Sequence, residues 1–192
     1  LVLPPSRKVR ALFAYLALAT RPVTRGHLCE LLFDLPSDPR GELRWCLSKL
    51  RAVVDGPGRA HVVASGDSVS LDLAGATVDA LEISEALRRG LGTLSTERLA
   101  ALARAFDGRQ ELLEGLDLPH SPAFTGWLVA ERRRFRAAQA AILEERVGRL
   151  PAASDEALGV LEAWLAIAPF DVRVHERILD ALAARGRLRE GD

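Results

Sequence analysis

The spacing of apolar residues constrains this chain more than any other feature. Apolar residues on one face of a helix recur every three or four positions, whereas those on one face of a strand alternate with polar residues. Helical spacing dominates the 192 residues, and residues 60–73 alternate instead. The sequence therefore predicts a mainly helical chain that contains one short β-hairpin.

Three helices are expected before this hairpin. The first extends from Ser6 to Ala19, and a short second helix follows Thr24, a residue type that favours the N-cap position. The third covers residues 39–54, because Asp38 supplies a capping side chain and Pro39 occupies the first helical position. The expected buried face of this third helix consists of Leu43, Leu47, Leu50 and Val54, with Cys46 beside them.

The hairpin follows the third helix directly. Apolar residues alternate on both sides of the turn sequence Ser65-Gly66-Asp67-Ser68, and its glycine suits a tight hairpin turn. Two helices, a short connection, a third helix with a polar outer face and a hairpin form the arrangement of a winged helix-turn-helix. We therefore expect a winged-helix DNA-binding domain over residues 1–74, with the hairpin as its C-terminal wing.

Beyond residue 74 the spacing is helical throughout. Two shorter helices are expected within residues 78–91 and 96–106, the second with Phe106 on its apolar face. Ser121-Pro122 opens a long helix that continues to about Arg149.

Two more helices are expected at the C-terminal end, the first capped by Ser154 and the second following Pro169-Phe170-Asp171. Paired helices joined by such a Pro-Asp turn are similar to tetratricopeptide repeats. We therefore expect an all-α, tetratricopeptide-like domain over residues 75–192.

Basic residues concentrate near the N-terminus. The whole chain has 26 basic and 26 acidic residues, but residues 1–54 carry nine basic and four acidic groups. This asymmetry is typical of a nucleic-acid-binding module joined to a second module.

The third predicted helix carries the most informative surface. Arginine and lysine donate hydrogen bonds to guanine, serine serves a base or a phosphate, and tryptophan packs on a sugar or a thymine methyl. Near the ends of the first two helices, further basic side chains would hold phosphates, and Ser65 and Ser68 of the wing would approach the minor groove. The candidate DNA-binding residues are Arg40, Arg44, Trp45, Ser48, Lys49 and Arg51 on the third helix, with Arg7, Lys8 and Arg25.

Two structural alternatives stay open. An amphipathic helix with a solvated basic face would give the same pattern over residues 39–54. The densest basic run, Arg132, Arg133, Arg134 and Arg136, is expected mainly to face solvent or to form ion pairs within its helix, and otherwise to contact nucleic acid or protein.

No enzyme signature is recognisable. A phosphate-binding loop would need a lysine after a glycine-rich stretch, and neither Lys8 nor Lys49 follows one. The four histidines are isolated, and the two cysteines, Cys29 and Cys46, fall on apolar helix faces where buried structural thiols occur. We therefore expect no enzyme activity, no cofactor and no metal site.

The sequence also lacks membrane and export signals. No apolar run approaches the ~18 residues of a membrane span, and the first residues lack the three-part organisation of a signal peptide. Two cysteines suit a reducing compartment. We expect a cytoplasmic protein.

Several segments, in this order, resemble bacterial transcriptional activators of the antibiotic-regulatory (SARP-like) class. The resemblance to the N-terminal winged helix rests on residues 3–8 and 12–17, on Val23-Thr24-Arg25, and on Leu47-Ser48-Lys49-Leu50-Arg51. The resemblance to the helical bacterial transcriptional activator domain that follows rests on Leu112-Leu113-Glu114-Gly115-Leu116 and on residues 127–132.

This resemblance implies an OmpR-type winged helix that binds direct repeats near promoters, often as side-by-side copies. It further implies a helical domain that supports self-association or contacts RNA polymerase, and a place on the bacterial nucleoid. By position, residues 39–54 would be the recognition helix, and Arg44, Ser48, Lys49 and Arg51 would touch DNA.

The chain departs from the family pattern at two places. A small antiparallel sheet precedes the first helix in the family, and only Leu1-Val2-Leu3 could belong to it here; Trp45 is a large aromatic on the exposed side of the recognition helix. The incomplete N-terminal sheet and the negative charge of the wing at Asp67 motivate an alternative function, a protein-interaction module whose winged helix no longer binds DNA.

Overall fold

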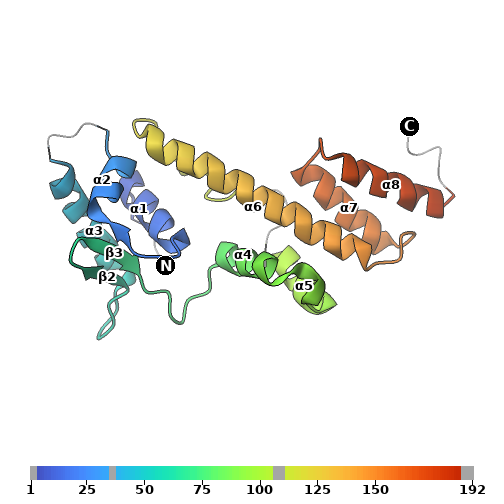
Figure 1. Cartoon of the computed structure of the whole chain (residues 1–192), viewed down its shortest axis with the longest axis horizontal. Coiled ribbons are helices and arrows are strands. Elements are labelled where there is room, and N and C mark those ends of the chain that lie inside the picture. Colours follow the sequence, from blue (N-terminus) through green and yellow to red (C-terminus); the bar gives the residue numbers. More distant parts are fainter. Residues whose placement is uncertain (1–3, 35–37, 106–110, 187–192) are drawn as a thin grey trace. The chain divides into compact units, whose positions relative to one another are not determined.

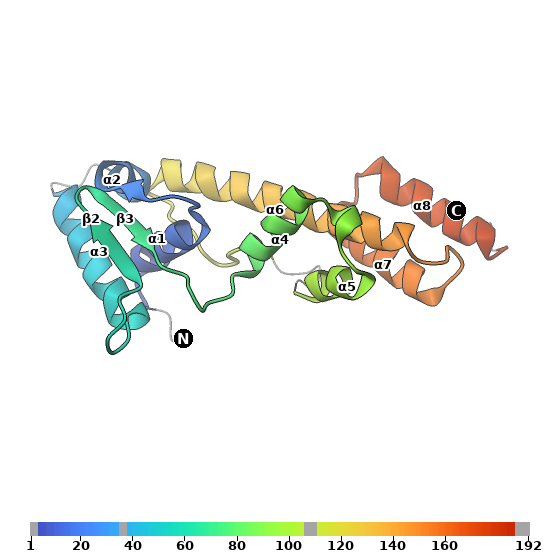
Figure 2. The same ribbon diagram turned by 60° about the horizontal axis from the view of Figure 1, so that its bottom comes forward.

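The structure, a computed structural model, describes residues 4–34, 38–105 and 111–186 (Figures 1 and 2). The prediction of a mainly helical chain with one short β-hairpin is confirmed, and the hairpin belongs to a three-stranded antiparallel sheet. The chain divides into two compact units: residues 1–78 with 113–131, and residues 79–112 with 132–192. The helices are α1 (Arg7–Leu18), α2 (Arg25–Leu32), α3 (Pro39–Val54), α4 (Asp79–Arg89), α5 (Thr96–Arg104), α6 (Pro122–Gly148), α7 (Asp155–Ile167) and α8 (Val172–Ala184), with a 3₁₀ turn at Leu91–Thr93.

Capping side chains fix where the helices of the first unit begin. The Thr24 hydroxyl accepts a hydrogen bond from the His27 backbone N–H, as its N-cap position requires. Asp38 likewise accepts from the Gly41 N–H at 2.8 Å, and Pro39 follows as the first residue of α3. The predicted starts of α2 and α3 are therefore confirmed.

The sheet of the first unit has three antiparallel strands in the order β1-β3-β2. Strands β2 (Val62–Ser65) and β3 (Ser68–Leu71) form the predicted hairpin, with Ser65 opposite Ser68 and a two-residue turn in which Gly66 has a φ of +57°. Strand β1 (Val23–Thr24) adds to β3, with Val23 opposite Val69. Figure 2 shows this hairpin beside α3, which it contacts through β2.

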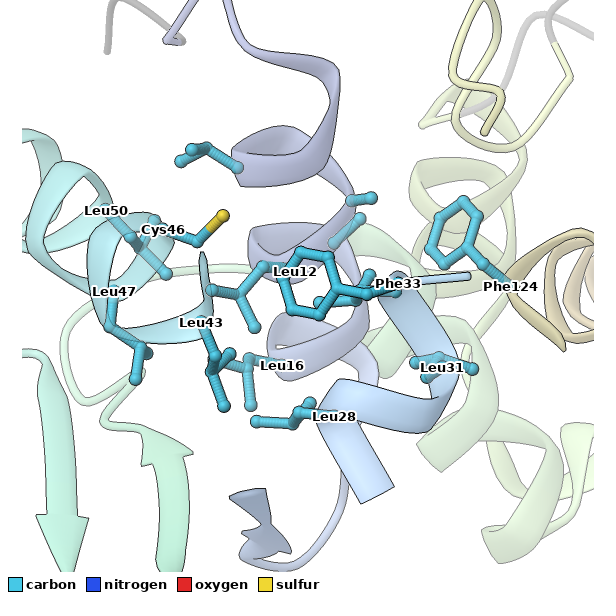
Figure 3. Close-up of a cluster of buried hydrophobic side chains, with 14 of the residues drawn as sticks. Leu12, Leu16, Leu28, Leu31, Phe33, Leu43, Cys46, Leu47, Leu50 and Phe124 are labelled. Atoms are coloured by element: carbon cyan, nitrogen blue, oxygen red, sulfur yellow. The ribbon is translucent and has the colours of Figure 1, made fainter. Parts of the chain in front are cut away.

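The core of the first unit includes a segment that lies far along the chain. Leucines of α1, α2 and α3 meet in one buried cluster, to which Val62 and Val69 of the hairpin contribute. Leu116, Leu118, Phe124 and Leu128 belong to the same cluster, and Phe124 is fully buried. Figure 3 shows Phe124 extending from α6 toward Phe33 and the helices of the N-terminal region.

Polar and aromatic contacts hold this segment in place. The Ser121 hydroxyl, which is buried, donates a 2.8 Å hydrogen bond to the Leu32 carbonyl at the end of α2. The Trp127 ring packs on Tyr15 with centroids 4.9 Å apart, and the Tyr15 hydroxyl lies 2.8 Å from Nε2 of His27. Residues 113–131 are therefore an integral part of the first unit.

We expect Ser121→Ala to lower the free energy of unfolding of the first unit by about 1–3 kcal/mol, because the carbonyl at the end of α2 loses its buried partner. Hydrogen exchange of α1 and α2, followed by mass spectrometry, measures this loss locally. Ser84→Ala is the matched control, since the Ser84 hydroxyl donates a hydrogen bond within its own helix, to the Ala80 carbonyl of α4. Equal exchange in both variants would contradict a structural role for the Ser121 hydroxyl.

The second unit is wholly helical in its described residues. Its core gathers apolar side chains of α4, α5, α7, α8 and the C-terminal part of α6 around the fully buried Trp164. The Ser154 hydroxyl caps α7 by accepting from the Ala157 N–H, as predicted. The Arg149 guanidinium donates to the Leu91 and Leu94 carbonyls and thereby ties the 3₁₀ turn to the end of α6.

The compact units differ from the two contiguous domains expected over residues 1–74 and 75–192. Residues 113–131 belong to the first unit, so α6 contributes its first ten residues to one core and the remainder to the other. Helical spacing identifies the buried stripe of α6 but carries no information about which partner covers each part of it. The possible remnant of an N-terminal sheet at residues 1–3, and Phe106, lie outside the described residues.

Candidate nucleic-acid interface

The backbone position of α3 is set by its first turn and its buried face. Asp38 closes the N-terminus, and a Cβ on Gly41 would displace the Asp38 carboxylate, so glycine at this position leaves room for the cap. Leu43, Leu47 and Leu50 are buried as predicted, together with Cys46, whereas Val54 is half-buried. The remaining positions of α3 are therefore presented outward by a well-anchored helix.

The exposed positions of α3 form two flanks. Arg40, Arg44 and Arg51 are four and seven residues apart and share one side of the helix, since successive residues are about 100° apart. Trp45 and Lys49 are four residues apart on the other flank, and Ser48 lies between the two. All except the half-buried Arg51 are exposed.

A concave surface of about 530 Å³ borders the arginine flank. Its floor includes Leu43 and Leu47 of α3, and its rim includes Arg25 from the first turn of α2 and Asp67 from the hairpin turn. Four of its seven lining residues are arginines, namely Arg25, Arg40, Arg44 and Arg51. We call this surface the arginine groove.

The hairpin turn is joined to the rim of the arginine groove by the backbone. The Arg25 N–H donates a 2.8 Å hydrogen bond to the Asp67 carbonyl, next to the pairing of Thr24 with Ser68. Strand β1 thus holds the start of α2 against the hairpin. Ser65 at the hairpin turn is exposed, whereas Ser68 is half-buried in the sheet.

The charge of the arginine groove is only partly neutralised. Within residues 4–34, 38–105 and 111–186, no carboxylate lies within 4.0 Å of the guanidinium groups of Arg25, Arg40 or Arg51. Arg44 lies 3.8 Å from an oxygen of Asp38, an exposed pair of small energetic value. The groove therefore presents an excess of positive charge, and guanidinium N–H groups suit phosphate oxygens.

Arg7 and Lys8 do not line the arginine groove. Arg7 pairs with Asp117 at 3.2 Å, within the first unit. Lys8 pairs with Glu42 at 2.5 Å, and its ammonium lies 5.0 Å from the centroid of the Phe33 ring. Both side chains are engaged in contacts within the protein.

Trp45 and Lys49 form a separate pair on the opposite flank of α3. The indole is 51% exposed, and the Lys49 ammonium lies 5.8 Å from its ring centroid. Neither residue lines the arginine groove, and neither does Ser48. The candidate residues of α3 therefore fall into an arginine group and a Trp45–Lys49 group.

Most of the basic run of α6 faces solvent, as expected, since Arg133, Arg134 and Arg136 are exposed. Arg132 and Arg136 both pair with Glu111, at 3.1 Å each, and Arg132 also donates to the Leu112 carbonyl. These partners precede α6 in the chain, so these two pairs are not the intrahelical ones that the spacing suggested. Arg133 is exposed on the same helix.

The two cysteines are buried thiols, as predicted. Burial raises the pKa of the Cys46 thiol to about 11 and also raises the pKa of Cys29. Both thiols are therefore protonated near neutral pH, which disfavours a nucleophilic role. Among the residues that the structure describes, no group of three or more His, Cys, Asp or Glu side chains could hold a metal ion.

Sequence reasoning missed the way in which Asp67 and Arg25 meet. A two-residue strand shows no periodicity, so nothing in the sequence places Val23 and Thr24 beside the hairpin.

None of the described helices has both the length and the apolar character of a membrane span. No protein-family model matches the chain, and a search of curated proteins finds no significant match.

Proposed function

We propose that the first unit is a winged-helix domain that binds double-stranded DNA, and that the protein is a sequence-specific transcription regulator of the activator type. The observation that carries this proposal is the arginine groove, in which α3 and the start of α2 bring four arginines to one concave face beside the hairpin turn. In this proposal α3 is the recognition helix and the β2–β3 hairpin is the wing.

The dimensions and chemistry of DNA agree with this assignment. The major groove is about 12 Å wide and admits one α-helix. Guanidinium groups of the arginine groove would pair with phosphates along one strand and fix the register of α3. The outward flank of α3 would then face the base edges.

For the second unit we propose a helical repeat domain that mediates self-association or contact with RNA polymerase. Large apolar side chains at its surface support an interaction role: Phe170 is 95% exposed, and Val172 and Leu179 of α8 are also exposed. We propose that the protein acts in the bacterial cytoplasm, at the nucleoid. In this proposal it catalyses no reaction.

Selection of binding sites from a pool of random duplexes with the whole chain tests the proposal. We expect a recurrent sequence to be enriched, and its affinity to fall steeply as salt rises because bound phosphates release counterions. Absence of duplex binding at low salt would contradict the proposal and would favour the alternative, a protein-interaction module built on the same fold.

A further inference from the structure

Trp45 is the largest side chain on the outward face of α3. Its indole is about half exposed, whereas the buried positions of the same helix are occupied by leucine and cysteine. It projects from a helix whose capped start and buried leucines hold it firmly. An exposed aromatic side chain on a well-anchored helix is a typical anchor for a ligand surface.

The position of Trp45 separates it from the phosphate-binding residues. It follows Arg44 directly and is therefore turned by about 100° around the helix axis from the arginine flank. If the arginines contact the sugar-phosphate backbone at one edge of the major groove, the flank with Trp45 is directed toward the base edges. Trp45 is thus placed to contact bases, not phosphates.

The chemistry of the indole restricts which base edge it can recognise. An indole offers one N–H donor and an extensive apolar ring, and it has no acceptor comparable to an amide or carboxylate oxygen. Among the four bases, only thymine presents an apolar group in the major groove, its C5 methyl. The Lys49 ammonium, 5.8 Å from the ring centroid, favours a fixed orientation of the ring through a cation–π contact.

We infer that Trp45 is a specificity-determining residue that recognises thymine in the bound duplex by apolar contact with its C5 methyl group. This inference rests on the proposed DNA binding by α3. It assigns to Trp45 the discrimination between base pairs, and to the arginine groove the affinity that does not depend on sequence.

Replacement of thymine by deoxyuridine tests the inference, because it removes the methyl group and leaves base pairing unchanged. Each thymine of a duplex selected with the wild-type chain is replaced in turn, and binding is measured by fluorescence anisotropy. At one or two thymines we expect the affinity of the wild-type chain to fall about three- to tenfold, the loss expected when a buried methyl contact is removed. We expect Trp45→Ala to bind the thymine and deoxyuridine duplexes equally.

Trp45→Phe is the matched control, since it retains an apolar ring and should retain most of the preference for thymine. Circular dichroism of Trp45→Ala should match the wild type, because the side chain lies outside the core. The inference is overturned if deoxyuridine has no effect at any thymine, or if Trp45→Ala shows the same thymine preference as the wild type. If the chain still binds duplex in a salt-dependent way after either of these results, the proposed DNA-binding function stands and only the role of Trp45 is rejected. Absence of all duplex binding would contradict both the proposed function and the role of Trp45.

Discussion

Phe124→Ala is expected to lower the free energy of unfolding of the first unit by about 3–5 kcal/mol, the range for deletion of a fully buried aromatic ring. Phe124 lies in the core formed by α1, α2, α3 and the hairpin, and its ring centroid is 5.2 Å from that of Trp127 (Figure 3). The expected loss is large because removing the Phe124 ring leaves a cavity in a closely packed core, and this core holds α3 in place.

Hydrogen exchange followed by mass spectrometry measures this effect for each unit separately, which a single melting temperature of a two-unit chain does not. We expect faster exchange in α1, α2 and α3, and unchanged exchange in α7 and α8. Val129→Ala is the matched control, because Val129 belongs to the same helix and is 59% exposed. If Phe124→Ala left the exchange of α1 to α3 unchanged, residues 113–131 would not be part of this core.

The second large effect is expected in DNA binding. Replacing Arg25 and Arg51 together by alanine should weaken duplex binding at least tenfold at 0.1 M salt, since each guanidinium is expected to make a charged hydrogen bond to a phosphate. The slope of log affinity against log salt should become less steep by about 1.8, because each phosphate contact contributes about 0.9. Neither arginine has an ion-pair partner among the described residues, so the double replacement removes no ion pair of the fold.

Two variants serve as controls for this result. Arg177→Ala removes an exposed arginine of α8 in the second unit and should change neither affinity nor salt slope. Arg25→Lys with Arg51→Lys keeps both charges, so the salt slope should stay close to the wild-type value while affinity falls through loss of bidentate geometry. An unchanged slope in the double alanine variant would show that the arginine groove does not contact phosphates.

The helices of this chain were largely predictable because local chemistry defines them. Thr24, Asp38 and Ser154 are capping residues in the sequence and in the structure, and α3 has the bounds that its spacing predicted. The hairpin was equally clear, because alternation and a glycine-containing turn occur together over residues 62–71. These features depend on neighbours within a few residues.

The contacts that the sequence did not reveal are all formed between distant segments. Strand β1 exists only because Val23 and Thr24 meet β3, which lies more than forty residues away in the chain. Phe124 was recognised as part of an apolar stripe, but its partners on α1 and α2 could not be read from spacing. The arginine groove depends on β1, so its combination of Arg25 with the arginines of α3 was not predictable either.

The central claim is that duplex DNA binds to the outward face of α3. Hydrogen exchange of the whole chain, with and without a selected duplex at moderate salt, locates the bound DNA directly. We predict slower exchange over residues 25–27, 39–54 and 62–71, and no change over α7 and α8. Protection confined to the second unit, or stable DNA binding that leaves α3 and the hairpin unprotected, would contradict this claim.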